Sequence, residues 1–186
     1  MKLGNEMPDL DSIDLQILSS LQEHCKISLA KLGEQVGLSA PSVIERIKKL
    51  EDSGVIVGYR ALVDAKLLGK DVTAFIGVSI SHPKLVEAFE RTIERLDDVL
   101  ECHHVTGGHT LLLKAKTENT ATLEGLISAI RSIEGVARTE TMVVLSTHTE
   151  RTQIVLSDHT DEEEAGNVRR ARNGARGGIQ HHPKRV

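Results

Sequence analysis

Aromatic residues and cysteines are scarce in this sequence. Its 186 residues include two Phe, one Tyr and no Trp, too few to stack the bases of a single-stranded nucleic acid. The two cysteines, Cys25 and Cys102, lie in unrelated segments and form no CxxC pair, so neither a zinc ribbon nor a redox motif is predicted. We expect both to be buried free thiols.

Long apolar runs and excess positive charge are also missing. No run has membrane-spanning length and the first residues form no secretory signal, so we expect a cytoplasmic protein with no membrane partner. The formal net charge is −4, and residues 1–60 contain seven basic and nine acidic side chains. DNA binding would therefore need a local basic face and a second copy of the chain.

Common catalytic motifs are absent, since there is no GxSxG, Walker loop, HExxH or dinucleotide fingerprint. Cys102, His103, His104 and His109 lie close together and suggest a metal site as an alternative. However, neighbouring residues of a strand face opposite sides, so only Cys102 and His104 would share a face. We predict no catalysis, no cofactor and no metal site.

The segment 27–56 predicts a helix-turn-helix. Ser28 can cap a short amphipathic helix, and Gly37 can take the positive φ that ends it. Ser39 can cap a second helix with Pro41 in its first turn. A third helix, capped by Asp11 or Ser12, is expected before this pair, and 55–59 is expected to be a β-rich wing.

The second helix, 40–52, is the predicted recognition helix. Val43, Ile47 and Leu50 recur on one face and point toward the first helix, which leaves polar residues outside. A helix of this kind fits the major groove of double-stranded DNA, where its first residues reach base edges and later basic groups reach phosphates. The predicted DNA-binding residues are Ser39, Ser42, Glu45, Arg46, Lys48 and Lys49, with Ser42, Glu45 and Arg46 at base edges and the two lysines at phosphates.

The second half of the chain predicts a ferredoxin-like β-α-β-β-α-β unit, so the fold class is α+β. The expected strands are 73–80, 99–106, 111–115 and 136–147, and the expected helices are 83–95 and 120–132. Apolar residues on both faces of the strands indicate that a second subunit packs on the sheet. We therefore expect a homodimer.

Four segments follow from this organisation. They are a winged helix-turn-helix (1–60), a connector (61–72), a βαββαβ effector-binding and oligomerisation domain (73–156) and a disordered tail (157–186). The tail has an acidic cluster followed by Arg- and Gly-rich residues. Its arginines 169, 170, 172 and 176 could touch DNA phosphates, but we interpret the tail, including His181 and His182, as a solvated surface feature.

Several motifs occur together in order. LDSIDLQIL is followed by a block of the form VGLSxxxVxxRIxxLExxGVIxGY and then by ECHxVxG. Between Leu10 and Ile154 the sequence resembles the Lrp/AsnC (feast/famine) family of transcriptional regulators. The resemblance implies a winged helix-turn-helix joined to a ligand-responsive βαββαβ domain, dimers formed through the sheets that often assemble into octamers, and small effectors, commonly amino acids, bound between dimers.

One turn departs from that family's pattern. Members usually carry Gly-Asp-aromatic-Asp after the ECHxVxG strand, whereas this chain has Gly107, Gly108, His109 and Thr110. Side chains of His109 and Thr110 and backbone N–H groups of the glycines could bind an effector instead. The predicted effector site comprises Thr106, Gly107, Gly108, His109 and Thr110, with Thr139, Glu140 and Thr141 from the facing final strand.

The predicted function is a sequence-specific, DNA-binding transcriptional regulator whose activity is modulated by a small molecule such as an amino acid. One alternative is an architectural DNA-binding protein without an effector, which would show a weak specificity ratio. A metal-responsive regulator is the other alternative.

Overall fold

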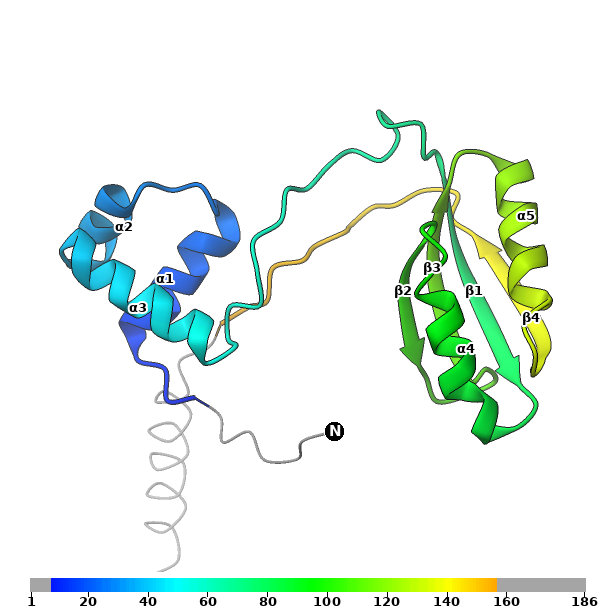
Figure 1. Ribbon diagram of the computed structural model, residues 1–186. Helices are drawn as coiled ribbons and strands as arrows, with labels where there is room; N and C mark the ends of the chain where they lie inside the picture. The colour runs from blue at the N-terminus through cyan, green and yellow to red at the C-terminus, as the bar shows by residue number, and fades with distance from the viewer. Residues whose placement is uncertain (1–7, 157–186) are drawn as a thin grey trace, which may run out of the picture. The chain divides into compact units, whose positions relative to one another are not determined.

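The computed structural model describes residues 8–156 (Figure 1), and they fall into two compact units. Leu62–Glu150 form one unit, while the other combines residues 8–61 with residues 151–156. Residues 151–156, expected with the sheet, therefore belong to the helical unit, where Ile154 and Leu156 find their partners. The predicted tail, 157–186, lies outside the described residues.

Three helices form the helical unit, as predicted: α1 (Ser12–Glu23), α2 (Leu29–Val36) and α3 (Ala40–Asp52). The residue that precedes each helix caps it, because its side chain accepts a hydrogen bond from a backbone N–H in the first turn. Asp11 caps α1, Ser28 caps α2 and Ser39 caps α3, which satisfies donors that have no partner within a helix. Local sequence thus fixes where all three helices start.

The helical unit has its own apolar core. Ile17, Leu32 and Val43, one from each helix, are completely buried, and burial of such side chains is the main stabilising contribution to a small domain. Beyond α3 the expected wing is missing. Residues 55–60 form no strand, and none of the four strands within residues 8–156 pairs with them. Val57 is 93% exposed.

The second unit has the predicted ferredoxin-like order. Its four antiparallel strands lie in the order β2-β3-β1-β4. The strands are β1 (Val72–Ile80), β2 (Val99–His104), β3 (Leu111–Thr117) and β4 (Val136–Val143), and the helices are η1 (Pro83–Leu85), α4 (Val86–Ile93) and α5 (Thr120–Arg131). The predicted helix 83–95 is thus a 3-10 turn followed by a shorter α-helix, and the last strand ends four residues earlier than 147.

One face of the sheet packs against the helices. Ile76 and Leu113 from the sheet, Phe89 from α4 and Ile130 from α5 are completely buried in this core. The opposite face carries the alternate strand residues, and no helix of this unit covers it. Cys25 and Cys102 are exposed free thiols, contrary to the expectation of burial. None of the helices within residues 8–156 is both long and apolar enough to cross a membrane.

Candidate nucleic-acid interface and effector site

The turn between α2 and α3 sets the position of the recognition helix. Gly37 takes the left-handed conformation, with φ 70° and ψ 29°, and the Leu38 N–H donates to the Gly33 carbonyl at 2.9 Å. A Cβ atom at Gly33 would lie 2.5 Å from the Leu38 carbonyl oxygen. The sequence predicts the role of Gly37 in this turn but not that of Gly33. Gly33 lies inside α2, where glycine is needed because the Leu38 carbonyl group of the following turn approaches it closely.

The predicted DNA-binding residues lie along one side of α3. Ser39, Glu45, Lys48 and Lys49 are exposed, and Ser42 is half-buried. Their helix is held from behind by Val43 and Leu50 in the core. The Ser39 and Ser42 hydroxyl oxygens are 2.9 Å apart, and the Ser42 backbone N–H also donates to Ser39 Oγ. The exposed side of α3 therefore combines hydroxyl, carboxylate and ammonium groups.

Arg46 differs from its neighbours because its guanidinium already has protein partners. Its Nη1 donates to Asp11 Oδ2 at 2.7 Å and to Asp14 Oδ1 at 2.8 Å. The Arg46 side chain is 30% exposed, whereas that of Asp14 is only 6% exposed. Arg46 therefore links α3 to the start of α1, and its contact with a base edge stays a prediction.

Electrostatics keep this tie ionised. Hydrogen bonds from the Asp14 backbone N–H and then from Arg46 lower the pKa of Asp11. Hydrogen bonds to Asp11 and then to Asp14 raise the pKa of Arg46. Each shift favours the charged form, so the tie holds at neutral pH. A hollow of about 450 Å³ beside it is lined by Asp11, Asp14, Leu38, Ser42, Glu45, Arg46 and Lys49.

The predicted effector residues are only partly brought together. His109 lies over Gly77 of β1, where an added Cβ would be 2.5 Å from His109 Cδ2. His109 Nε2 is 3.7 Å from Glu140 Oε2 on β4, and His109 Nδ1 is buried without a hydrogen-bond partner within the described chain. Glycine at position 77 therefore makes room for the imidazole beside a carboxylate.

Other members of that predicted set have different roles. The Thr110 hydroxyl accepts the Ile80 backbone N–H at 3.1 Å and so holds the β2–β3 loop to β1. Thr139 and Thr141 pair with Val78 and Ile76, whose side chains face the helices. They are therefore on the opposite face from Glu140, because strand residues alternate. The structure removes Thr139 and Thr141 from the predicted site.

The remaining effector candidates, Thr106, Gly107 and Gly108, are exposed in the loop between β2 and β3. The residues of the alternative metal site lie on two faces of the sheet, as strand alternation predicts. Cys102 and His104 pair with core residues of β3 and so lie on the helix-covered face, while His103 on the other face hydrogen-bonds Glu101. Within residues 8–156 no three His, Cys, Asp or Glu side chains are grouped to hold a metal ion.

The open face of the sheet is amphipathic. Phe75, Leu112 and Met142 occupy neighbouring positions of β1, β3 and β4, and Met142 is 47% exposed. Lys114 lies in the same cross-strand row as Phe75, and its ammonium group donates to Glu101 at 3.2 Å and to Glu150 at 2.7 Å. An apolar centre bordered by paired charges is typical of a protein interface.

Family comparisons match both units. Residues 10–51 match the AsnC-type helix-turn-helix domain, and residues 73–154 match the Lrp/AsnC ligand binding domain. Together these matches cover the three helices of the helical unit except the last residue of α3, and the strands and helices of the sheet unit except the first residue of β1.

Individual proteins show the same similarity over most of their length. The HTH-type transcriptional regulator FL11 of Pyrococcus abyssi is 35% identical over 145 residues, which cover 78% of this chain and 95% of that protein. The structure of Escherichia coli AsnC has a TM-score of 0.74 at 31% identity and covers 78% of this chain and 99% of that one. A transcriptional regulator from Neisseria meningitidis in complex with L-methionine has a TM-score of 0.75 at 30% identity, with 79% and 97% covered.

Proposed function

This chain belongs to the Lrp/AsnC family of transcriptional regulators, and on that premise we propose that α3 binds its target DNA through Ser39, Ser42, Glu45, Lys48 and Lys49. The protein acts in transcription regulation as a DNA-binding helix-turn-helix protein. A regulator must reach the chromosome, so we place it in the cytoplasm.

One observation carries this assignment. The apolar side of α3 is fixed by Val43 and Leu50, while Glu45, Lys48 and Lys49 project from the other side without an ion-pair partner among residues 8–156. A buried stripe that orients a polar face is what a helix needs to enter the major groove. Arg46 is left out of the contact set because its Nη1 is held by two carboxylates.

We expect the variant carrying Lys48→Ala and Lys49→Ala to bind DNA with a weaker salt dependence. Each lost phosphate contact lowers the slope of log K against log salt by about 0.9, so the expected change is about 1.8 per bound chain. Fluorescence anisotropy with an operator duplex at several salt concentrations measures it. The matched control is Lys84→Ala, an exposed lysine of the sheet unit, which should leave the slope unchanged.

The same titrations distinguish a regulator from an architectural DNA-binding protein, and they also give the number of chains bound per operator. A regulator should prefer its operator over a scrambled duplex by about 10³-fold or more, whereas a packaging protein should not.

We propose that the open face with Phe75, Leu112 and Met142 joins two copies of the chain. Two chains bound per operator support this dimer, and an unchanged salt slope in the double lysine variant contradicts the α3 assignment.

We further propose an amino-acid effector site at His109 and Glu140. The relative with bound L-methionine supports this class of ligand. Glu140 is half exposed beside the β2–β3 loop and could pair with an α-ammonium group. The backbone N–H groups of Gly107 and Gly108 could then take the α-carboxylate. In this arrangement Glu140 on β4 replaces the carboxylates that the loop does not have.

A thermal-shift screen of the twenty amino acids tests this site. A ligand at ten times its dissociation constant should stabilise the protein by about 1.4 kcal/mol, which raises the Tm by about 3–11 °C. Glu140→Gln should abolish that shift, while Thr139→Ala, on the opposite face of the same strand, should retain it. If no amino acid stabilises the full chain at millimolar concentration, the effector proposal fails and the DNA-binding proposal is untouched.

A further inference from the structure

One side of α3 is turned away from the core of the helical unit. Val43 and Leu50 are buried in that core, and four exposed residues lie on the opposite side of the helix, at the i, i+3, i+4 and i+7 positions that share one face. We call this the outer face of α3, and its residues are Pro41, Ile44, Glu45 and Lys48. When the helix enters a major groove with the rest of the unit outside the groove, the outer face lies against the base edges.

Ile44 is the residue of the outer face that the fold does not explain. Ile47, three residues further along α3, packs against the apolar cluster of the helical unit, whereas Ile44 is 49% exposed. Isoleucine is a weaker helix former than alanine, leucine, lysine or glutamate, and a side chain left in water gains little from burial. Neither helix stability nor core packing therefore accounts for an isoleucine at position 44.

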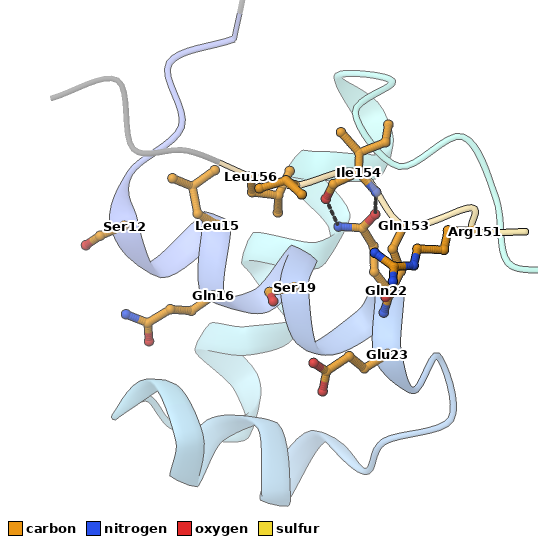
Figure 2. Close-up of a pocket in the computed structure, with 11 residues that line it drawn as sticks. Ser12, Leu15, Gln16, Ser19, Gln22, Glu23, Arg151, Gln153, Ile154 and Leu156 are labelled. Carbon is orange, nitrogen blue, oxygen red and sulfur yellow. Dashed lines mark hydrogen bonds between the residues drawn. The ribbon is translucent and has the colours of Figure 1, made fainter. Parts of the chain in front are cut away.

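Exposed apolar side chains beside α1 have a different origin. Ile154 and Val155 are 72% and 93% exposed, but they belong to an extended segment that the Gln22 side chain holds by its backbone. Gln22 Nε2 donates to the Ile154 carbonyl oxygen at 3.1 Å, and the Ile154 N–H donates to Gln22 Oε1 at 2.8 Å (Figure 2). Attachment through the backbone leaves these two side chains at the surface. Ile44, by contrast, lies on a helix, which is an element that a major groove admits.

The major groove offers one apolar partner for such a side chain. Its base edges present hydrogen-bond donors and acceptors, and the only methyl group on the bases of unmodified DNA is at C5 of thymine. Glu45, next to Ile44, also suits base edges rather than phosphates, because a carboxylate is repelled by phosphate and can accept a hydrogen bond from the cytosine amino group. Lys48, one turn further along, can reach the phosphate backbone. The outer face therefore has its base-reading groups before its cationic group.

We propose that Ile44 reads the DNA sequence by packing against the C5 methyl group of a thymine in the major groove. The inference rests on the proposed DNA-binding function of α3 and adds a specificity-determining residue to it. The contact involves no charge, so it favours one sequence over another without changing the number of phosphates that the protein neutralises. The polar residues of α3, from which the DNA-binding set was predicted, give no signal for such a contact.

The first test removes the methyl group from the DNA. The full chain is used to select binding sites from a pool of random-sequence duplexes, and each thymine of a selected duplex is then replaced in turn by deoxyuridine, which lacks only the C5 methyl group. We expect at least one thymine at which the affinity falls about fourfold, because burial of one such group contributes about 0.8 kcal/mol. Unchanged affinity at every thymine overturns the proposal.

The second test removes the side chain. Ile44→Ala should bind the thymine duplex and the matching uracil duplex with equal affinity, because the group that tells them apart is gone. Leu29→Ala, at a 38% exposed leucine of α2, is the matched control and should keep the fourfold preference. Alanine is the best helix former, so both variants should remain folded. If Ile44→Ala weakens binding to both duplexes and still prefers thymine fourfold, another residue contacts the methyl group and the proposal is overturned.

Ile44→Val provides a conservative comparison, because it keeps the branched Cβ and loses only the terminal methyl group. Its preference for thymine should lie between those of the natural chain and Ile44→Ala. The salt dependence of both Ile44 variants should match that of the natural chain, which separates the apolar contact from the phosphate contacts of Lys48 and Lys49. If the full chain enriches no sequence from the pool, the DNA-binding proposal for α3 fails and the inference fails with it. An enriched sequence with equal thymine and uracil affinities overturns the inference alone.

Discussion

Replacing Arg46 with Ala is expected to lower the free energy of unfolding of the helical unit by about 2 kcal/mol. The substitution leaves Asp14, whose side chain is 6% exposed, without the guanidinium that neutralises it. Stranding one member of a fully buried pair costs about 3–5 kcal/mol, and the smaller figure here reflects the 30% exposure of Arg46. Hydrogen exchange of amides in α1 and α3 measures the change within this unit.

A double-mutant cycle separates this tie from a DNA contact. Replacing Asp14 with Asn removes the partner charge, so Arg46→Ala should cost much less stability in that background than in the natural chain. Lys49→Ala, on the exposed side of the same helix, is the control and should change stability by less than about 0.5 kcal/mol. Additive effects of Arg46→Ala and Asp14→Asn would contradict the tie.

The pH dependence of stability provides an independent test of the contact between Arg46 and Asp11. The pKa of Asp11 is lowered in the folded protein, first by the Asp14 backbone N–H and then by Arg46. Its contribution to stability is therefore present above its unfolded pKa of about 3.9 and is lost as the pH falls toward the lower folded value. The difference in stability between the natural chain and Arg46→Ala should narrow below about pH 4.

The contrast between Ser39 and Arg46 shows what the sequence alone could predict. Ser39 and Gly37 act on residues within a few positions of themselves, so the cap, the turn and the start of α3 are all local. The periodicity of α3 also predicts Arg46 on a polar side of the helix. Its partners Asp11 and Asp14, however, are 35 and 32 residues away, and the periodicity of α3 contains no information about them.

The sheet and residues 151–156 show the same distinction. Alternating β-branched residues and turn glycines predicted the β-α-β-β-α-β order, because register and hydrophobic pattern are coupled in strands. Residues 151–156 have no helical or strand periodicity that could identify their partner, and Gln22 lies 132 positions from Ile154. The predicted effector set had a related error. Proximity in sequence grouped Thr139 and Thr141 with Glu140, but alternation places them on opposite faces of β4.

A second large effect is expected at Gly33, where alanine should destabilise the helical unit by about 1–3 kcal/mol and weaken DNA binding. In an ordinary helix the change from Gly to Ala is favourable by about 1 kcal/mol. Here the new Cβ would lie 2.5 Å from the Leu38 carbonyl oxygen. That oxygen is backbone, so the contact can be relieved only by moving the turn that places α3, and overpacking of this kind costs about 1–3 kcal/mol beyond the lost helix gain.

Gly125 in α5 is the matched control, because a Cβ there would meet no atom within 4 Å. The same substitution at Gly125 should stabilise the sheet unit by about 0.5–1 kcal/mol, through helix propensity alone. Chemical denaturation followed by hydrogen exchange in α2 and α5 compares the two variants, and operator affinity should fall only for Gly33→Ala. Stabilisation by both substitutions would show that the turn between α2 and α3 can yield, and that its close approach to Gly33 does not fix the recognition helix.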